Sequence, residues 1–138
     1  MKILFIASVA VIAVDPGENR KLFIDTLKLP LQRHEGDDYY FSENIDGAKH
    51  FGVWPLSQAA EACFGVKEWP KDRPTPQACV EFEVEDADSV SSSAKELTDK
   101  GYTLLHEPRT EPWGQVVARI QTPEGVIVGI SYAPWLHK

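Results

Sequence analysis

Val80-Glu-Phe-Glu-Val-Glu-Asp86 alternates apolar and acidic residues and ends in an aspartate. Strict alternation is typical of a strand with one buried face, and either Asp86 or Asp88 suits the start of the helix that follows it. Near the beginning of the chain, Val9-Ala-Val-Ile-Ala-Val-Asp15 is a second apolar stretch that ends in an aspartate, and it runs into the helix-start signature Asp15-Pro-Gly-Glu18. Because a strand-to-helix stretch occurs in both halves, the sequence predicts an internally repeated domain.

The elements that follow each stretch come in the same order. In the first half, Leu22, Phe23 and Leu27 give the predicted helix an apolar face, and Pro30 ends it. In the second half, Gly101 is well placed to end the helix in the left-handed conformation. Three strands are then expected in each half, over residues 31–33, 39–43 and 49–54 and over residues 103–105, 115–121 and 126–132.

The whole chain is therefore predicted to be a single α+β domain of two βαβββ modules. Module one covers residues 1–65 and module two covers residues 78–138. Residues 66–77 carry three prolines among charged side chains, which is typical of a linker. A chain of 138 residues suits one domain with a substantial core.

Residues 3–14 allow a second interpretation. The basic Lys2, the apolar run and the small residues near its end also resemble a signal peptide. We favour a buried first strand, because the run leads directly into the helix start at Asp15 and its second half has a counterpart at residues 80–86. The run is too short for a transmembrane helix.

The net charge and the number of cysteines indicate which binding partners and which cellular compartment to expect. The chain has a formal net charge of −7, which argues against a surface for nucleic-acid phosphates. No membrane association is expected either. Two cysteines, Cys63 and Cys79, without CxxC spacing favour a reduced, cytoplasmic protein, although a single disulfide is also compatible with the sequence.

The second half of the chain carries a more specific pattern. After residues 80–86 come the helix end Lys100-Gly-Tyr102, the loop Glu107-Pro-Arg-Thr-Glu-Pro-Trp-Gly114 and the turn Pro123-Glu-Gly125. In order and spacing, these motifs resemble the glyoxalase/bleomycin resistance protein/dioxygenase superfamily, also called the vicinal oxygen chelate superfamily. The resemblance implies a curved, U-shaped sheet around a ligand cavity, with helices packed outside, and it implies a homodimer.

Metal-using members of that superfamily hold their ion with His, Gln or Glu side chains at four strand positions. On this sequence, the resemblance maps those positions near Val9 and Phe51 and onto Cys79 and Gly129. Three of these residues offer no donor atom, and one thiolate is not a metal site. We therefore expect no metal and no other cofactor. Among the histidines, His50 is the one that could still be a ligand, since a one-residue change of register would turn its side chain into the cavity.

Strand alternation and loop positions predict which side chains surround the cavity. Glu81 and Arg119 are expected to face inward, either as ligand-binding groups or as a structural ion pair. Phe51, Trp54 and Trp113 are expected near the cavity mouths. Aromatic walls there suit planar ligands, although core or dimer-interface packing would also explain these residues.

Three functions are compatible with this sequence. The first is a metal-free binding protein for a small aromatic or cationic molecule, as bleomycin-resistance-type relatives are. The second is a divergent lyase, isomerase or dioxygenase that uses a metal bound elsewhere or acid-base chemistry at Glu81. The third is a module that binds a protein partner. We favour the first, because the mapped metal positions lack donors and the chain is acidic and rich in tryptophan.

Overall fold

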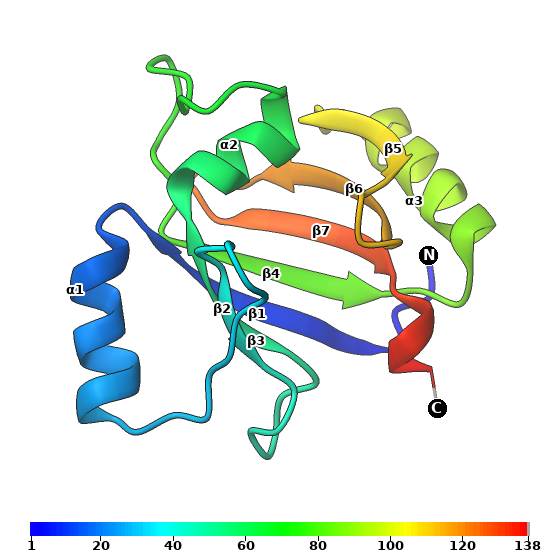
Figure 1. The fold of residues 1–138 in the computed structure, drawn as a ribbon. Coiled ribbons are helices and arrows are strands. Elements are labelled where there is room, and N and C mark those ends of the chain that lie inside the picture. The colour runs from blue at the N-terminus through cyan, green and yellow to red at the C-terminus, as the bar shows by residue number, and fades with distance from the viewer. Residues whose placement is uncertain (138) are drawn as a thin grey trace.

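The computed structural model describes residues 1–137, and Lys138 lies outside the described residues. The strands form one curved sheet in the order β2-β3-β1-β4-β7-β6-β5 (Figure 1), which confirms the predicted α+β fold. The strands are β1 (Phe5–Ala13), β2 (Tyr40–Ser42), β3 (Phe51–Pro55), β4 (Ala78–Glu83), β5 (His106–Thr110), β6 (Val116–Gln121) and β7 (Ile127–Tyr132). The helices are α1 (Pro16–Arg20), the π-helix η1 (Lys21–Thr26), α2 (Leu56–Phe64), α3 (Ala87–Asp99) and the 3₁₀ helix η2 (Pro134–Leu136).

The two central strands relate the halves of the chain to each other. Strands β1 and β4 run antiparallel, with Val9 opposite Val80 and Ala10 opposite Cys79. On its other edge, each central strand pairs in parallel with the last strand of its own half, β3 for β1 and β7 for β4. The inner strands of the two halves are therefore paired in the same way, although the first half contributes β1 to β3 and the second contributes β4 to β7.

Burial along β4 follows the alternation seen in the sequence. Cys79, Glu81 and Glu83 are buried on one face, and Phe82 packs on the other face beneath α3. Asp86 begins α3 by accepting a backbone N–H bond of 2.8 Å in its first turn. The buried residues of this outer cluster are Val84, Val90, Ala94, Ala118 and Ile130.

Helix α2 lies over the opposite face, at one end of the sheet (Figure 1). It ends at Gly65, whose φ of 77° is the left-handed conformation that glycine adopts without strain. Its buried alanines pack against Trp54 and against inward-facing residues of the central strands. The buried residues of this inner cluster are Ala10, Ile12, Trp54, Ala59, Ala60, Ala62, Cys63, Trp69, Cys79 and Ile127.

Two of the predicted strands are wrong. Residues 31–33 make a single bridge, between Gln32 and Phe41, instead of a strand. The strand predicted over residues 103–105 lies further along, in β5, and includes Pro108. Proline is tolerated there because β5 is the edge strand and its pairing with β6 is irregular, so the missing N–H leaves no partner unsatisfied.

The first helix begins as predicted and then departs from the α-helical pattern. Asp15 caps it by accepting a backbone N–H bond of 3.2 Å. The chain continues as the π-helix η1, and neither α1 nor η1 buries a residue fully. Leu22 and Leu27 are 48% and 52% exposed, which corrects the expected buried face, whereas Phe23 packs against Phe51.

The helices are short. The longest α-helix, α3, has 13 residues, whereas about 20 are needed to cross a bilayer. Within residues 1–137, no helix combines the length and the hydrophobicity of a membrane span.

Candidate functional site

A cavity of about 500 Å³ lies on the inner face of the sheet. Strand β1 contributes Ala7, Ser8 and Ala10 to its lining, and β4 contributes Cys79 and Glu81. The small side chains of β1 leave the space that larger residues would fill. Its volume lies within the range of small-molecule sites, about 300–1,000 Å³.

A β-bulge in β1 sets which side chains reach this cavity. The pairing of β1 with β4 shifts between Ile6 and Ser8, so that Ala7 is an extra residue. A bulge of this kind redirects side chains next to a site. Ser8 lies opposite Glu81 and faces the cavity with it, whereas Val9 is turned to the outer face.

Stacked rings form one wall of the cavity. Phe41 and His50 stack with ring centres 5.3 Å apart and an interplanar angle of 10°. Tyr39 stacks on both, and its hydroxyl lies 2.5 Å from His50 Nε2. Burial raises the pKa of Tyr39 well above its usual range, so the phenol is the hydrogen-bond donor. Gly52 lies directly under the Tyr39 ring, where a Cβ atom would collide with it.

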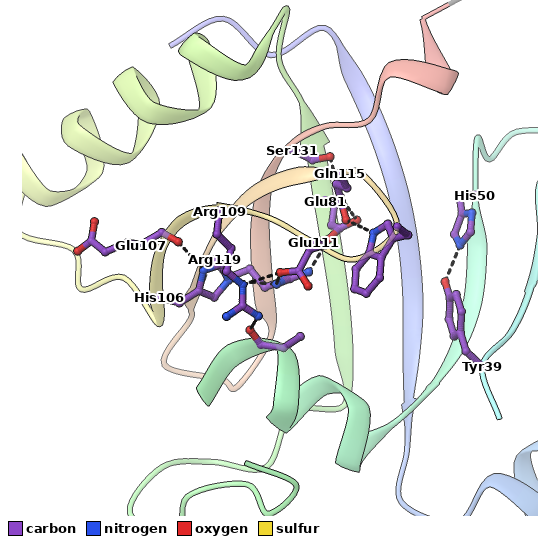
Figure 2. A network of polar contacts seen from close by, with 12 residues as sticks. Tyr39, His50, Glu81, His106, Glu107, Arg109, Glu111, Gln115, Arg119 and Ser131 are labelled. Carbon is purple, nitrogen blue, oxygen red and sulfur yellow. Dashed lines mark hydrogen bonds and ion pairs between the residues drawn. The ribbon is translucent and has the colours of Figure 1, made fainter. Parts of the chain in front are cut away.

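A chain of hydrogen bonds holds Glu81 on the other side of the cavity (Figure 2). Gln115 Nε2 donates to Glu81 Oε1 at 3.0 Å and to Ser131 Oγ at 2.8 Å. Gln115 Oε1 accepts from the Trp113 indole N–H at 2.8 Å, which fixes the orientation of the amide. Glu81 is therefore held as an acceptor, with its second carboxylate oxygen directed at Arg119.

Arg119 is the most deeply buried charge of the site, at 1% exposure. Its guanidinium lies 3.2 Å from Glu111 and 3.7 Å from Glu81, and its Nη1 donates to His106 Nε2 at 3.0 Å (Figure 2). Burial opposes its charge, but the acidic neighbours, first Glu81, prevail and raise the pKa of Arg119. The guanidinium also lies over the Trp54 ring, 5.6 Å from its centre. Arg119 is thus a cation whose charge the protein already compensates.

The C-terminal segment closes one end of the cavity. Trp135 and Leu136 of η2 line it. The fully buried Glu83 anchors the segment by accepting from the Ala133 backbone N–H at 2.5 Å and from His137 Nε2 at 2.7 Å. The side chains of η2 are therefore held over the cavity by contacts with the central strand β4.

Four of the five site residues predicted from the sequence line the cavity, namely Trp54, Glu81, Trp113 and Arg119. Phe51 does not, because β3 places it on the outer face against Phe23, with ring centres 5.7 Å apart. Its neighbour His50 takes the inward position, as expected for a register one residue away from the prediction. Tyr39, Phe41 and Gln115 also line the cavity and were not among the predicted ligand-binding residues, although strand alternation places Gln115 on the inner face. Tyr39, Tyr40 and Phe41 are three aromatic residues in a row, so no alternation in the sequence indicates which of them face the cavity.

The residues at the mapped metal positions do not fit a metal ion. Val9 and Phe51 lie on the outer face. Burial raises the pKa of Cys79 well above its usual range, which keeps the thiol protonated. At Gly129, the space for a side chain is taken by Glu81, whose Cγ lies 3.0 Å from where a Cβ would be. Among residues 1–137, no three His, Cys, Asp or Glu side chains converge to hold a metal ion.

Both thiols are free, and we expect both to be unreactive in the native protein. Burial raises the pKa of Cys63 to about 11 and also raises the pKa of Cys79 well above its usual range. Because the thiolate is the reactive form, dithionitrobenzoate at neutral pH is expected to modify neither residue until urea unfolds the chain. Fast release of the coloured product from the folded protein would contradict the burial of these thiols.

Two histidines make stability depend on pH. Burial lowers the pKa of His50, although Glu43 and Glu81 act in the opposite direction, and burial also lowers the pKa of His106. The unfolded chain therefore binds more protons than the folded chain once the pH falls below about 6.5. We expect the free energy of unfolding to fall with pH from there down to the folded-state pKa values, by at most about 1.4 kcal/mol per pH unit for each histidine.

Urea denaturation across this pH range measures the effect. His50→Gln keeps an acceptor near Tyr39 and removes one titrating group, so its stability should depend less steeply on pH than that of the wild type. Measurements at about pH 8, where neither histidine is protonated, give the change in the free energy of unfolding that the substitution causes independently of protonation. An unchanged slope in His50→Gln would contradict the assignment.

Comparison with protein-family models matches residues 5–130 to the Glyoxalase/Bleomycin resistance protein/Dioxygenase superfamily. No curated protein matches the sequence. Among solved structures, a methylmalonyl-CoA epimerase from Streptomyces coelicolor in complex with 2-nitronate-propionyl-CoA superposes with a TM-score of 0.60 at 12% identity, over 99% of both chains.

Two further structures are similar in the same way. A glyoxalase/bleomycin resistance protein/dioxygenase superfamily member from Vibrio splendidus gives a TM-score of 0.55 at 14% identity, covering 90% of this chain and 95% of that chain. A protein described as NAD-dependent benzaldehyde dehydrogenase from Legionella pneumophila gives 0.59 at 14% identity, covering 90% and 96%. At such low identities, the similarity shows the fold alone, and the chemistry has to be argued from the residues of the site.

The family match covers both strand-to-helix units and the strands that line the cavity. This match shows that the chain belongs to the glyoxalase/bleomycin resistance protein/dioxygenase superfamily, and the similar strand pairing of the two halves agrees with it.

Proposed function

We propose that the cavity binds a small, planar, cationic aromatic molecule, and that it does so without a metal ion. The observation that carries this proposal is that stacked aromatic rings and carboxylates line the same cavity. Tyr39, Phe41 and His50 form one wall. The buried carboxylate of Glu81 lies on the other side of β1 from Tyr39 and His50 (Figure 2). Flat ligands gain from contact with ring faces, and cations gain further from the negative potential above those faces.

The balance of charge around the cavity favours a cation. Asp37, Glu43 and Glu81 line it, against the single guanidinium of Arg119. Part of that guanidinium charge is engaged by Glu111, which lies outside the lining. Because the pKa of His50 is lowered, its ring adds no charge at neutral pH. An incoming cation would offset the surplus of carboxylates, whereas an anion would meet repulsion.

The same charge balance argues against the kind of ligand that one structural neighbour binds. The epimerase superposes over almost its full length, and that protein was solved in complex with 2-nitronate-propionyl-CoA, an acyl-CoA compound. The several phosphate charges of such a ligand need cationic groups, and this cavity offers one arginine that is already paired. We therefore do not extend acyl-CoA binding to this protein.

A set of three ring compounds of similar shape tests the proposal. Proflavine is a cation at neutral pH, acridine is neutral and anthracene carboxylate is an anion. We expect proflavine to raise the melting temperature of the chelator-treated protein in a concentration-dependent way, acridine to raise it less, and anthracene carboxylate to leave it unchanged. Stabilisation by the anion, or by none of the three compounds, would refute a site for planar cations.

A further inference from the structure

A second hollow adjoins the cavity and extends it towards the surface. This outer groove has a volume of about 700 Å³ and lies between helix α2 and residues 109–113. It shares part of its lining with the cavity. The residues that line both are Asp37, Trp54, Gln58 and Trp113. A ligand seated in the cavity can therefore reach the groove without leaving the protein surface.

The shared residues form a neck between the two spaces. Gln58 Nε2 donates to Asp37 Oδ1 at 2.9 Å, which links helix α2 to the loop before β2. The same oxygen accepts the Tyr39 backbone N–H at 3.0 Å, so the loop is fixed next to the aromatic wall. On the opposite side of the neck, Trp113 belongs to the loop between β5 and β6 and is 51% exposed. Its indole N–H donates to Gln115, which also binds Glu81. The neck is thus polar on one side and aromatic on the other.

The outer groove carries more acidic than basic groups. Its basic residues are Lys67 and Arg109. Arg109 is already bound by Glu111, at 2.8 Å, and by the carbonyl of Ala62. On the acidic side, Asp38 and Glu61 are exposed and, within residues 1–137, take part in no ion pair. Glu61 projects from α2, and Asp38 follows Asp37 in the neck, so both carboxylates are available to a ligand.

We propose that the ligand has two parts: a planar cationic ring in the cavity and a flexible arm ending in an amine, which passes Gln58 and Trp113 and lies along the groove near Glu61. This inference rests on the proposed function, since the ring part must bind first. An arm adds affinity because its binding is intramolecular once the ring is seated, so little further rotational freedom is lost. The terminal amine then contributes attraction to the exposed carboxylates.

The test compares proflavine with proflavine derivatives that carry an aminoalkyl arm, from ethyl to octyl, and with derivatives whose alkyl arm lacks the amine. Dissociation constants come from the fluorescence of the ring. We expect the best aminoalkyl arm to bind about tenfold more tightly than proflavine, and the matching alkyl arm to bind less tightly than the aminoalkyl arm. Glu61→Lys should abolish the gain from the amine and leave proflavine binding unchanged.

Glu124→Lys is the matched control, because Glu124 is also an exposed glutamate and lies in the turn between β6 and β7, outside both spaces. It should retain the full gain. If proflavine binds and no arm of the series improves on it, or if Glu61→Lys keeps the gain, the two-part ligand is refuted while the cavity site stands. If neither proflavine nor its derivatives bind, the proposed function itself fails, and this inference fails with it.

Discussion

Replacing Arg119 with methionine is expected to lower the free energy of unfolding by about 3–5 kcal/mol. Methionine fills much of the space of the arginine stem but leaves the buried carboxylate of Glu81, at 8% exposure, without its cation, whereas Glu111 keeps its ion pair with Arg109. An uncompensated buried charge costs far more than a surface ion pair contributes. Equilibrium denaturation in urea at neutral pH measures the difference.

Arg119→Lys provides the comparison for this variant. Lysine keeps the positive charge but loses the fork of donors that reaches Glu111, Glu81 and His106 together, so an intermediate loss of stability is expected. If Arg119→Met does not fold, the lysine variant still reports the effect. A loss below about 1 kcal/mol in either variant would show that the network contributes little, as exposed pairs do.

Trp54→Ala is expected to be the other severe substitution, with a loss of about 3–5 kcal/mol. Trp54 is 9% exposed, lies in the inner core cluster with the alanines of α2 and supports the Arg119 guanidinium. Removing the indole leaves a void between the helix and the sheet that close packing does not refill. Thermal and urea unfolding followed by circular dichroism measure the loss.

Trp135→Ala is the matched tryptophan control. Trp135 also lines the cavity, but it lies on η2 and is 39% exposed. Its truncation is expected to cost about 1 kcal/mol or less, because a partly exposed side chain buries less surface. Equal losses in the two variants would contradict the supporting role assigned to Trp54.

Elements with strong local patterns could be predicted from the sequence. The alternation in residues 80–86 predicts both the strand β4 and the inward direction of Glu81, and the structure confirms both. Asp15 and Asp86 cap the helices that they are expected to begin. These features depend on neighbours within a few residues, which is the range over which periodicity and capping act.

The register of β3 could not be predicted in the same way. Residues 49–54 show no clean alternation of apolar and polar side chains, and shifting a strand by one residue exchanges its faces. The structure assigns the inner face to His50, Gly52 and Trp54, and it thereby removes Phe51 from the predicted site. The pairing of β3 with β1 decides this, and it is a contact between distant parts of the chain.

The rest of the site is also a product of tertiary structure. Gln115 joins Glu81 to Trp113 and Ser131, and these residues lie up to 50 positions apart in the chain. No local sequence motif predicts such contacts. The bulge at Ala7 likewise depends on the pairing of the two central strands. The sequence therefore predicts the cavity and its central carboxylate, whereas the aromatic wall and the neck follow from the fold.

The most direct test of the central claim is the dissociation constant of proflavine, measured by calorimetry on chelator-treated protein, for the wild type and for Glu81→Gln. Glutamine keeps the shape of the side chain and can still accept from Gln115, so mainly the charge is lost. We predict that the chelator-treated wild type binds proflavine and that Glu81→Gln binds it about ten- to a hundredfold more weakly. Equal affinity in the two proteins, or binding that requires an added metal ion, would contradict a metal-free cation site at Glu81.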